Sequence, residues 1–183
     1  MCRLAWDRPG RTVRGHKATQ GQRAVPTPSA RSQHTHIQHI KDDTLWYPEL
    51  FMLDGAPFQK DPATGYVTER RKTRIYLHDG AVKVLNALRT LPQFEHAHVA
   101  LASRTEYEEW AHTCLGLLNV APGMSAADAV SDRRLWQIFP SNKRRHFDRI
   151  RQALGDVPYE SMIFFDNERS NCTEITNFLV SMV

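Results

Sequence analysis

Residues 162–171 read Met-Ile-Phe-Phe-Asp-Asn-Glu-Arg-Ser-Asn, an apolar run that ends abruptly in a carboxylate and a polar cluster. An apolar run between polar residues is typical of a strand that is covered on both faces, and α/β proteins bind their ligands at the carboxyl ends of such parallel strands. Asp166 is therefore the first candidate site residue. The alternative is that Asp166 only caps a helix that begins near Arg169.

Strand-like and helix-like segments alternate from residue 41 onward. The expected strands are residues 97–102, 136–139 and the run that begins at Met162, and amphipathic helices are expected after Asp79, after Thr105, from Lys143 and through Glu174. This alternation predicts an α/β fold with a mostly parallel sheet and helices on both faces. Residues 47–74 contain several glycines and prolines and are expected to form a loop or a small hairpin insertion.

The composition of the 183 residues, with 41% hydrophobic and 24% charged, fits one well-buried domain. No apolar run is long enough to span a membrane, so no membrane partner is expected. The three cysteines are far apart and form no CxxC pair, which indicates neither a disulfide framework nor a zinc site. A reducing, cytoplasmic location is therefore expected.

The positive charge is concentrated in the first 40 residues. They carry seven Lys or Arg against one acid, whereas residues 41–183 carry 17 against 19. Residues 1–38 show no periodicity and offer little apolar surface for burial, so this tail is expected to be disordered. Its arginines leave two alternatives, but an organellar transit peptide needs an apolar helix face, and nucleic-acid binding needs a fold to present the charges.

Polar residues fall at the ends of successive expected strands or at helix starts. They are Asp42 with Asp43, Ser103, Lys143 and Asp166. In an α/β sheet with right-handed crossovers these ends converge on one crevice. Carboxylates hold a hard cation such as Mg²⁺, a hydroxyl beside helix amides binds phosphate oxygens, and a lysine offsets phosphoryl charge. The sequence therefore predicts a combined magnesium and phosphate site.

Four short motifs carry a family resemblance. They are Asp-Asp-Thr-Leu-Trp at 42–46, Ala-Ser-Arg-Thr at 102–105, Pro-Ser-Asn-Lys at 140–143 with the His-Phe that follows, and Phe-Phe-Asp-Asn-Glu-Arg at 164–169. With them the chain, from about residue 42 to residue 183, resembles the eukaryotic magnesium-dependent phosphatases of the haloacid dehalogenase-like (HAD-like) superfamily. The resemblance implies a Rossmann-like domain, Mg²⁺ as cofactor, and hydrolysis of a phosphorylated small molecule or phosphoprotein through an aspartyl-phosphate.

The resemblance also implies a role for each motif residue. Asp42 would be the general acid and base and would lend its backbone carbonyl to Mg²⁺. Ser103 and Arg104 would bind the phosphoryl oxygens, and Lys143 would neutralise their charge. Asp166 would be the metal-ligand carboxylate. The insertion at residues 47–74 falls where the family has its flap and small cap.

Several of these residues have simpler interpretations. Ser103 is also a favoured helix N-cap, and Lys143, read alone, belongs to a solvated basic patch with the two arginines that follow it. His146 is expected at the helix surface and Cys172 in packing contacts. Asn167 stands where many relatives have a second Asp, a mild change because one carboxylate plus waters satisfies Mg²⁺.

The nucleophile of the superfamily is missing from its expected position. The superfamily motif is Asp-x-Asp-x-Thr, and its first Asp takes the phosphoryl group. Counting back from Thr44 through Asp42 places that position at Ile40, whose side chain cannot attack phosphorus. The segment before it, residues 33–39, is too polar for the buried central strand that the family requires. We therefore expect a missing or degenerate first strand.

Three explanations of Ile40 remain open at this stage. Asp42 becomes the nucleophile in a shifted register, the chain is a non-catalytic phosphate-binding or regulatory module, or residues 1–40 derive from a wrong exon or start site. The change in composition at Lys41 favours the third. The expected organisation is a tail at 1–38 and a HAD-like phosphatase domain at 39–183, with the flap insertion at about 47–74. We expect the protein to be a monomer and, with Ile40 at the nucleophile position, to be inactive.

Overall fold

The computed structural model describes residues 35–38 and 42–180 and contains a parallel four-stranded sheet. The strand order is β10-β1-β6-β9, and every neighbouring pair in it is parallel. The strands are β1 (Thr35–Gln38), β6 (Val99–Ser103), β9 (Trp136–Ile138) and β10 (Met162–Phe165). All four carboxyl ends therefore point to the same edge of the sheet.

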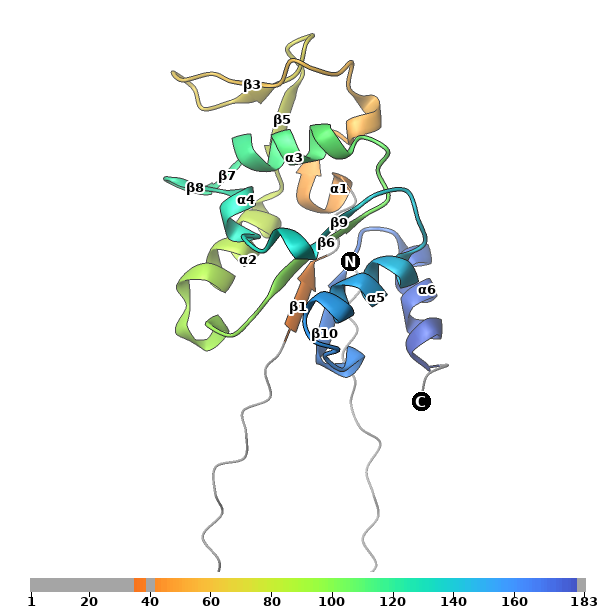
Figure 1. Ribbon diagram of the computed structural model, residues 1–183. Coiled ribbons are helices and arrows are strands. Elements are labelled where there is room, and N and C mark those ends of the chain that lie inside the picture. The colour runs from red at the N-terminus through yellow and green to blue at the C-terminus, as the bar shows by residue number, and fades with distance from the viewer. Residues whose placement is uncertain (1–34, 39–41, 181–183) are drawn as a thin grey trace, which may run out of the picture.

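Helices cover both faces of this sheet (Figure 1). Val99 and Leu101 of β6 pack in one core cluster with residues of α2 (Asp79–Thr90), α3 (Glu108–Leu117) and α4 (Ala126–Ala129). The intervening Ala100 and Ala102 pack in a second cluster with residues of α5 (Lys143–Ala153) and α6 (Arg169–Val180). Successive side chains of a strand point to opposite faces, so β6 is apolar throughout because each face meets helices. The predicted α/β class is confirmed.

Helix α2 shows how the apolar spacing produces this packing. Ala81, Leu85 and Leu88 are buried and form one face of the helix, as the spacing predicts. Val84 belongs to the same predicted face but is 37% exposed, so it lies at the edge of the apolar stripe. Burial of each leucine contributes roughly 1.5–3 kcal/mol. The helix ends where Pro92 begins a short 3-10 turn, η2 (Pro92–Phe94).

A small antiparallel sheet occupies the predicted insertion. Its strand order is β2-β5-β4-β3, and in Figure 1 it lies beyond the carboxyl end of β1. In β5, Ile75 and Leu77 are buried while Arg74 and Tyr76 are exposed, the alternation of a sheet with one covered face. The elements of this region are α1 (Asp42–Leu45), β2 (Trp46–Tyr47), η1 (Leu50–Met52), β3 (Gln59–Lys60), β4 (Val67–Thr68) and β5 (Arg74–Leu77).

Short elements connect the longer helices and strands. A two-stranded ladder of β7 (Asn119–Ala121) and β8 (Met124–Ser125) precedes α4, and the turns η3 (Arg133–Leu135) and η4 (Tyr159–Ser161) precede β9 and β10.

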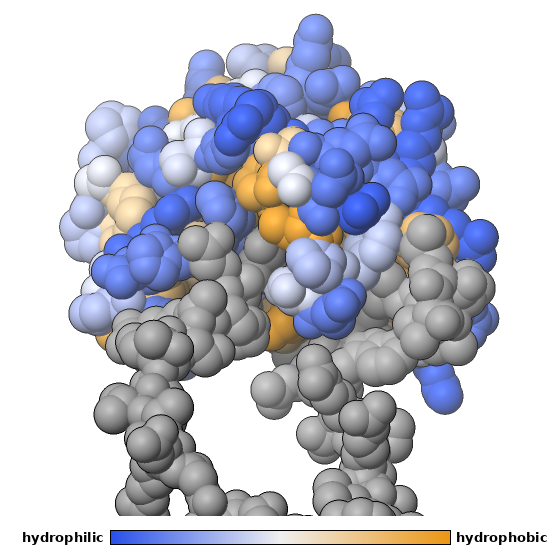
Figure 2. All heavy atoms as spheres, turned by 60° about the horizontal axis from the view of Figure 1, so that its bottom comes forward, coloured by the Kyte–Doolittle hydropathy of each residue, from blue (hydrophilic) through white to orange (hydrophobic). Residues whose placement is uncertain are grey.

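Among the helices of the described residues, none combines the length and apolar content needed to cross a membrane. The face at the bottom of Figure 1 is mostly hydrophilic around a small apolar area (Figure 2).

The first strand differs from the prediction. The expected disorder of residues 1–38 is wrong for Thr35–Gln38, which form β1 in the centre of the sheet, paired with β10 on one side and β6 on the other. Backbone N–H and C=O groups pair regardless of side-chain polarity, and a strand between two neighbours satisfies these groups on both sides. The rest of the predicted tail, residues 1–34, and the nucleophile position Ile40 lie outside the described residues.

Candidate active site

Asp166 directly follows β10 and is 2% exposed. Its Oδ1 accepts a hydrogen bond from the Glu168 amide at 2.7 Å, and its Oδ2 accepts one from Asn171 Nδ2 at 2.9 Å. The bond from the Glu168 amide, in the turn before α6, fits the alternative that Asp166 caps this helix. The bond from the Asn171 side chain, inside α6, is not part of a helix cap. Together the two bonds fix the orientation of a buried carboxylate at the carboxyl edge of the sheet.

Lys143 is the first residue of α5 and is completely buried. Its Nζ donates to the backbone oxygen of Ala102 in β6 at 2.8 Å. Burial lowers the pKa of the ammonium from 10.5 to about 7, against the opposite effect of three carboxylates, first that of Asp166 and then those of Glu174 and Glu168. The solvated-patch interpretation of Lys143 is therefore wrong, although the two arginines after it are exposed.

Ser103 ends β6 and is 1% exposed. Its Oγ accepts a hydrogen bond from the Thr105 amide at 3.2 Å, and α3 begins only at Glu108, so Ser103 is not the N-cap of that helix. The Ser103 backbone oxygen accepts from the Phe139 amide at 3.1 Å. This bond ties the end of β6 to the loop that leads from β9 to Lys143. Strand β6 therefore positions both Ser103 and Lys143.

Glu174, for which the sequence predicts no role, joins two predicted phosphate-binding residues. Its Oε1 accepts from the Lys143 backbone amide at 3.0 Å, and its Oε2 forms an ion pair with the Arg104 guanidinium. A carboxylate at the amino end of α5 satisfies an amide without a helical partner and interacts favourably with the helix dipole. Glu174 therefore holds the Ser103–Arg104 loop against the start of α5.

The motif at 42–46 contacts the motif at 164–169 through Asn167. Thr44 Oγ1 donates to Asn167 Oδ1 at 2.9 Å and accepts from the Asn167 amide at 3.1 Å, while Asn167 Nδ2 donates to Asp43 Oδ2 at 3.3 Å. Asp43 also lies 3.5 Å from His78 Nε2. An aspartate at position 167 has no N–H to offer to Asp43, so asparagine suits this contact. The side chain of Asp42, which starts α1, lies outside the described part of the site.

His146 is buried, so its predicted surface position is wrong. Its Nε2 lies 3.0 Å from the Phe139 backbone oxygen, and the two rings are 4.3 Å apart. Burial lowers the pKa of the imidazole to about 4, which keeps the ring neutral near pH 7, so Nε2 carries the hydrogen that it donates to Phe139. His146 thereby supports the loop before Lys143. Cys172 packs in the core, as predicted.

The strand order brings the candidate groups together. Asp166 and Ser103 end the two strands that flank β1, which places their backbones about 10 Å apart across it. Lys143 reaches back to β6, and Asp43 and Thr44 meet the loop after β10. The oxygen donors Asp166, Asp43 and Asn167 suit Mg²⁺, which takes one or two carboxylates and keeps several waters. The described residues contain no group of three His, Cys, Asp or Glu arranged to hold a metal.

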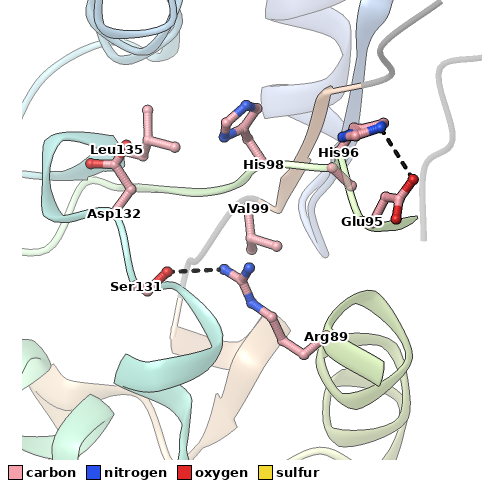
Figure 3. Close-up of a pocket in the computed structure, with 9 residues that line it drawn as sticks. Arg89, Glu95, His96, His98, Val99, Ser131, Asp132 and Leu135 are labelled. Carbon is pink, nitrogen blue, oxygen red and sulfur yellow. Dashed lines mark hydrogen bonds and ion pairs between the residues drawn. The ribbon is translucent and has the colours of Figure 1, made fainter. Parts of the chain in front are cut away.

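A cavity of about 380 Å³ lies elsewhere, at the amino end of β6 (Figure 3). Among its charged groups, Arg89 donates to the Ala129 oxygen at 2.6 Å and to Ser131 Oγ at 3.4 Å, Asp132 pairs with Arg134 at 2.7 Å, and Glu95 lies 3.2 Å from His96 Nε2. Val99 in its lining stands four residues before Ser103, about 13 Å along an extended strand. This cavity is therefore separate from the site at the carboxyl edge.

Two comparisons with known proteins agree with this geometry. The Acid Phosphatase family model matches residues 41–183. A curated relative from Homo sapiens, magnesium-dependent phosphatase 1, is 31% identical over 145 residues, which cover 78% of this chain and 72% of the relative. The family match begins at residue 41, so β1 and position 40 lie outside it, whereas all four motifs lie inside.

Proposed function

Because the chain belongs to the HAD-like magnesium-dependent phosphatase family, we propose that its site binds Mg²⁺ and the phosphoryl group of a phosphate monoester. One observation carries the proposal. Asp166, Ser103 and Lys143 are each at most 2% exposed, yet they stand together where neighbouring elements meet at the carboxyl edge of the sheet. Burial of polar groups is costly, so three of them at one sheet edge favour a binding site over simple packing.

Each residue has a defined part in this proposal. The Ser103 hydroxyl and the Arg104 guanidinium bind phosphoryl oxygens, and the Lys143 ammonium offsets their charge in a partly dry site. Asp166 and the backbone carbonyl of Asp42 hold the metal. When bound, Mg²⁺ supplies positive charge that neutralises the phosphoryl oxygens. In the family reaction, Asp42 would be the acid and base that moves a proton to or from the ester oxygen.

Position 40 limits the proposal to binding. Hydrolysis through an aspartyl-phosphate requires a carboxylate at this position, and the isoleucine side chain forms no bond to phosphorus. We therefore propose that the family reaction, hydrolysis of a phosphorylated small molecule or phosphoprotein, does not proceed in this sequence. Ile40 favours the second candidate function, a module that binds phosphate without turning it over.

Calorimetry tests the metal assignment. Asp166→Ala should weaken Mg²⁺ binding by at least about tenfold, or 1.4 kcal/mol, because the oriented carboxylate is lost. Glu160→Ala is the matched control, since it removes an exposed carboxylate from η4. Equal Mg²⁺ affinity in the wild type and Asp166→Ala, or no binding in either, would refute the assignment. In parallel, the wild type should hydrolyse an aryl phosphate no faster than buffer alone.

A further inference from the structure

A groove of about 240 Å³ opens beside the small sheet, away from the candidate active site. It lies between strands β3, β4 and β5 on one side and α2 and the start of β7 on the other. Its floor includes apolar side chains, and its walls carry two cations and two tyrosines. The residues that matter here are Lys60, Tyr66, Arg74, Tyr76, Val82 and Leu118.

Arg74 is held by aromatic rings. Its Cζ lies 3.4 Å from the centre of the Tyr66 ring and 5.8 Å from that of the Tyr76 ring. Such cation–π contacts restrain the guanidinium, and Arg74 remains exposed to solvent. Within residues 42–180, Arg74 forms neither a side-chain hydrogen bond nor an ion pair. The guanidinium is therefore pre-positioned to bind an anion, and its fork of donors matches a carboxylate.

Lys60 supplies the second positive charge. Its Nζ donates to the backbone oxygen of Leu117, the last residue of α3, at 3.0 Å. No acidic side chain lines the groove. The adjacent Asp61 carboxylate instead accepts hydrogen bonds from the amides of Ala63 and Thr64 at 2.8 Å and 2.9 Å, and these bonds lower its pKa. The groove thus combines uncompensated positive charge with apolar and aromatic surface.

We propose that this groove binds an acidic segment of a protein partner, with one Glu or Asp carboxylate on Arg74. The apolar floor at Val82 and Leu118 suits the aliphatic part of such a side chain. A nucleic acid fits less well, because backbone recognition needs many phosphate contacts along a basic stripe, and the groove offers two cations in a small volume. None of its lining residues belongs to the candidate active site, so the inference is independent of the proposed function.

The probe is fluorescein-labelled hexaglutamate, with hexaglutamine as the uncharged control, measured by fluorescence anisotropy. Arg74→Ala should weaken hexaglutamate binding by at least about tenfold, because it removes the stacked donor. Lys72→Ala removes one positive charge from the turn between β4 and β5, outside the groove, and it should change the affinity by less than about twofold. Tyr66→Leu keeps the charge of Arg74 and removes its main ring contact, so an intermediate loss is expected.

A second readout separates the groove from the basic N-terminal residues. In wild type and in Lys72→Ala, saturating hexaglutamate should shift the Nε–H NMR signal of Arg74, and circular dichroism should show that all variants are folded. Three results would overturn the proposal. They are equal losses in Arg74→Ala and Lys72→Ala, an unchanged Arg74 signal at saturation, or tighter binding of a deoxythymidine decamer that also shifts this signal, which would make the occupant a nucleic acid.

Discussion

Titration of Lys143 gives the most direct test of the candidate phosphate site. Sulfate is a suitable probe because its charge stays constant near neutral pH, whereas phosphate itself titrates there. Burial lowers the pKa of Lys143 to about 7, so the ammonium that binds the anion is lost as the pH rises through this value. His146 does not interfere, since its lowered pKa of about 4 keeps it neutral throughout the range tested.

The expected size of the effect follows from proton linkage. If sulfate binds only when Lys143 is protonated, the observed Kd grows with the deprotonated fraction, from about 10% at pH 6 to about 90% at pH 8. The Kd should therefore rise about tenfold between about pH 6 and about pH 8, equivalent to about 1.4 kcal/mol. Lys143→Met should bind weakly with no pH dependence, and Lys143→Arg should lose the pH dependence because a guanidinium stays charged.

Isothermal titration calorimetry in buffers with different ionisation enthalpies supplies the measurement, because it reports both the Kd and the proton uptake. Near pH 8 the wild type should take up close to one proton on binding sulfate, and Lys143→Met should take up none. A wild-type Kd that stays constant across the range, or the same profile in Lys143→Met, would show that Lys143 does not face the anion.

Three further predictions concern the residues around Lys143 and the first motif. Glu174→Gln removes a carboxylate that raises the pKa of Lys143, so the midpoint of the sulfate profile should move below about pH 7; an unchanged midpoint with weaker binding would indicate a purely structural role. Asn167→Asp loses the donor to Asp43 and places two carboxylates together, so chemical denaturation without Mg²⁺ should show a loss of about 1 kcal/mol that Mg²⁺ recovers; destabilisation that persists in Mg²⁺ would exclude position 167 from the metal site. Ile40→Asp should raise magnesium-dependent hydrolysis of an aryl phosphate at least about 10²-fold above the unmodified chain. This increase is smaller than the roughly 10⁶-fold effect of a nucleophile in a complete active site. If the unmodified chain is substantially active and Asp42→Asn abolishes this activity, Asp42 is the nucleophile instead.

The fold from residue 79 onward was predictable because the spacing of its apolar side chains matches the faces that are buried. Leu85 and Leu88 recur at helical spacing, and Leu101 lies in a run that is apolar on both strand faces. Strand β1 carries no such signal, since Ile37 is the one apolar residue in Thr35–Gln38. Its place depends on backbone pairing with β10 and β6, which side-chain patterns do not encode.

The candidate site was predictable where a polar residue ends a strand, as at Asp166 and Ser103. Its supporting residues were not, because their partners are distant in sequence. Glu174 lies 31 residues from Lys143 and 70 from Arg104, so no local pattern connects them. His146 has a polar side chain on a helix, and it is buried in the tertiary structure, where Phe139 packs against its ring. The role of a residue that only supports another residue is therefore difficult to predict from a single sequence.

Contacts among residues 44–174 hold the groups that are proposed to bind phosphate and Mg²⁺. The Asp166 carboxylate is oriented by Glu168 and Asn171, the Ser103–Arg104 loop is held by Glu174, and the loop after β10 is tied to Thr44 through Asn167. Each of these contacts joins two residues that come after position 42, within the range that matches the phosphatase family. We therefore expect an isoleucine at position 40 to prevent the covalent step without removing the groups proposed to hold phosphate and Mg²⁺. Because β1 already occupies the centre of the sheet, we expect the barrier to activity in the unmodified chain to be the missing carboxylate rather than a missing strand, and Ile40→Asp tests this expectation.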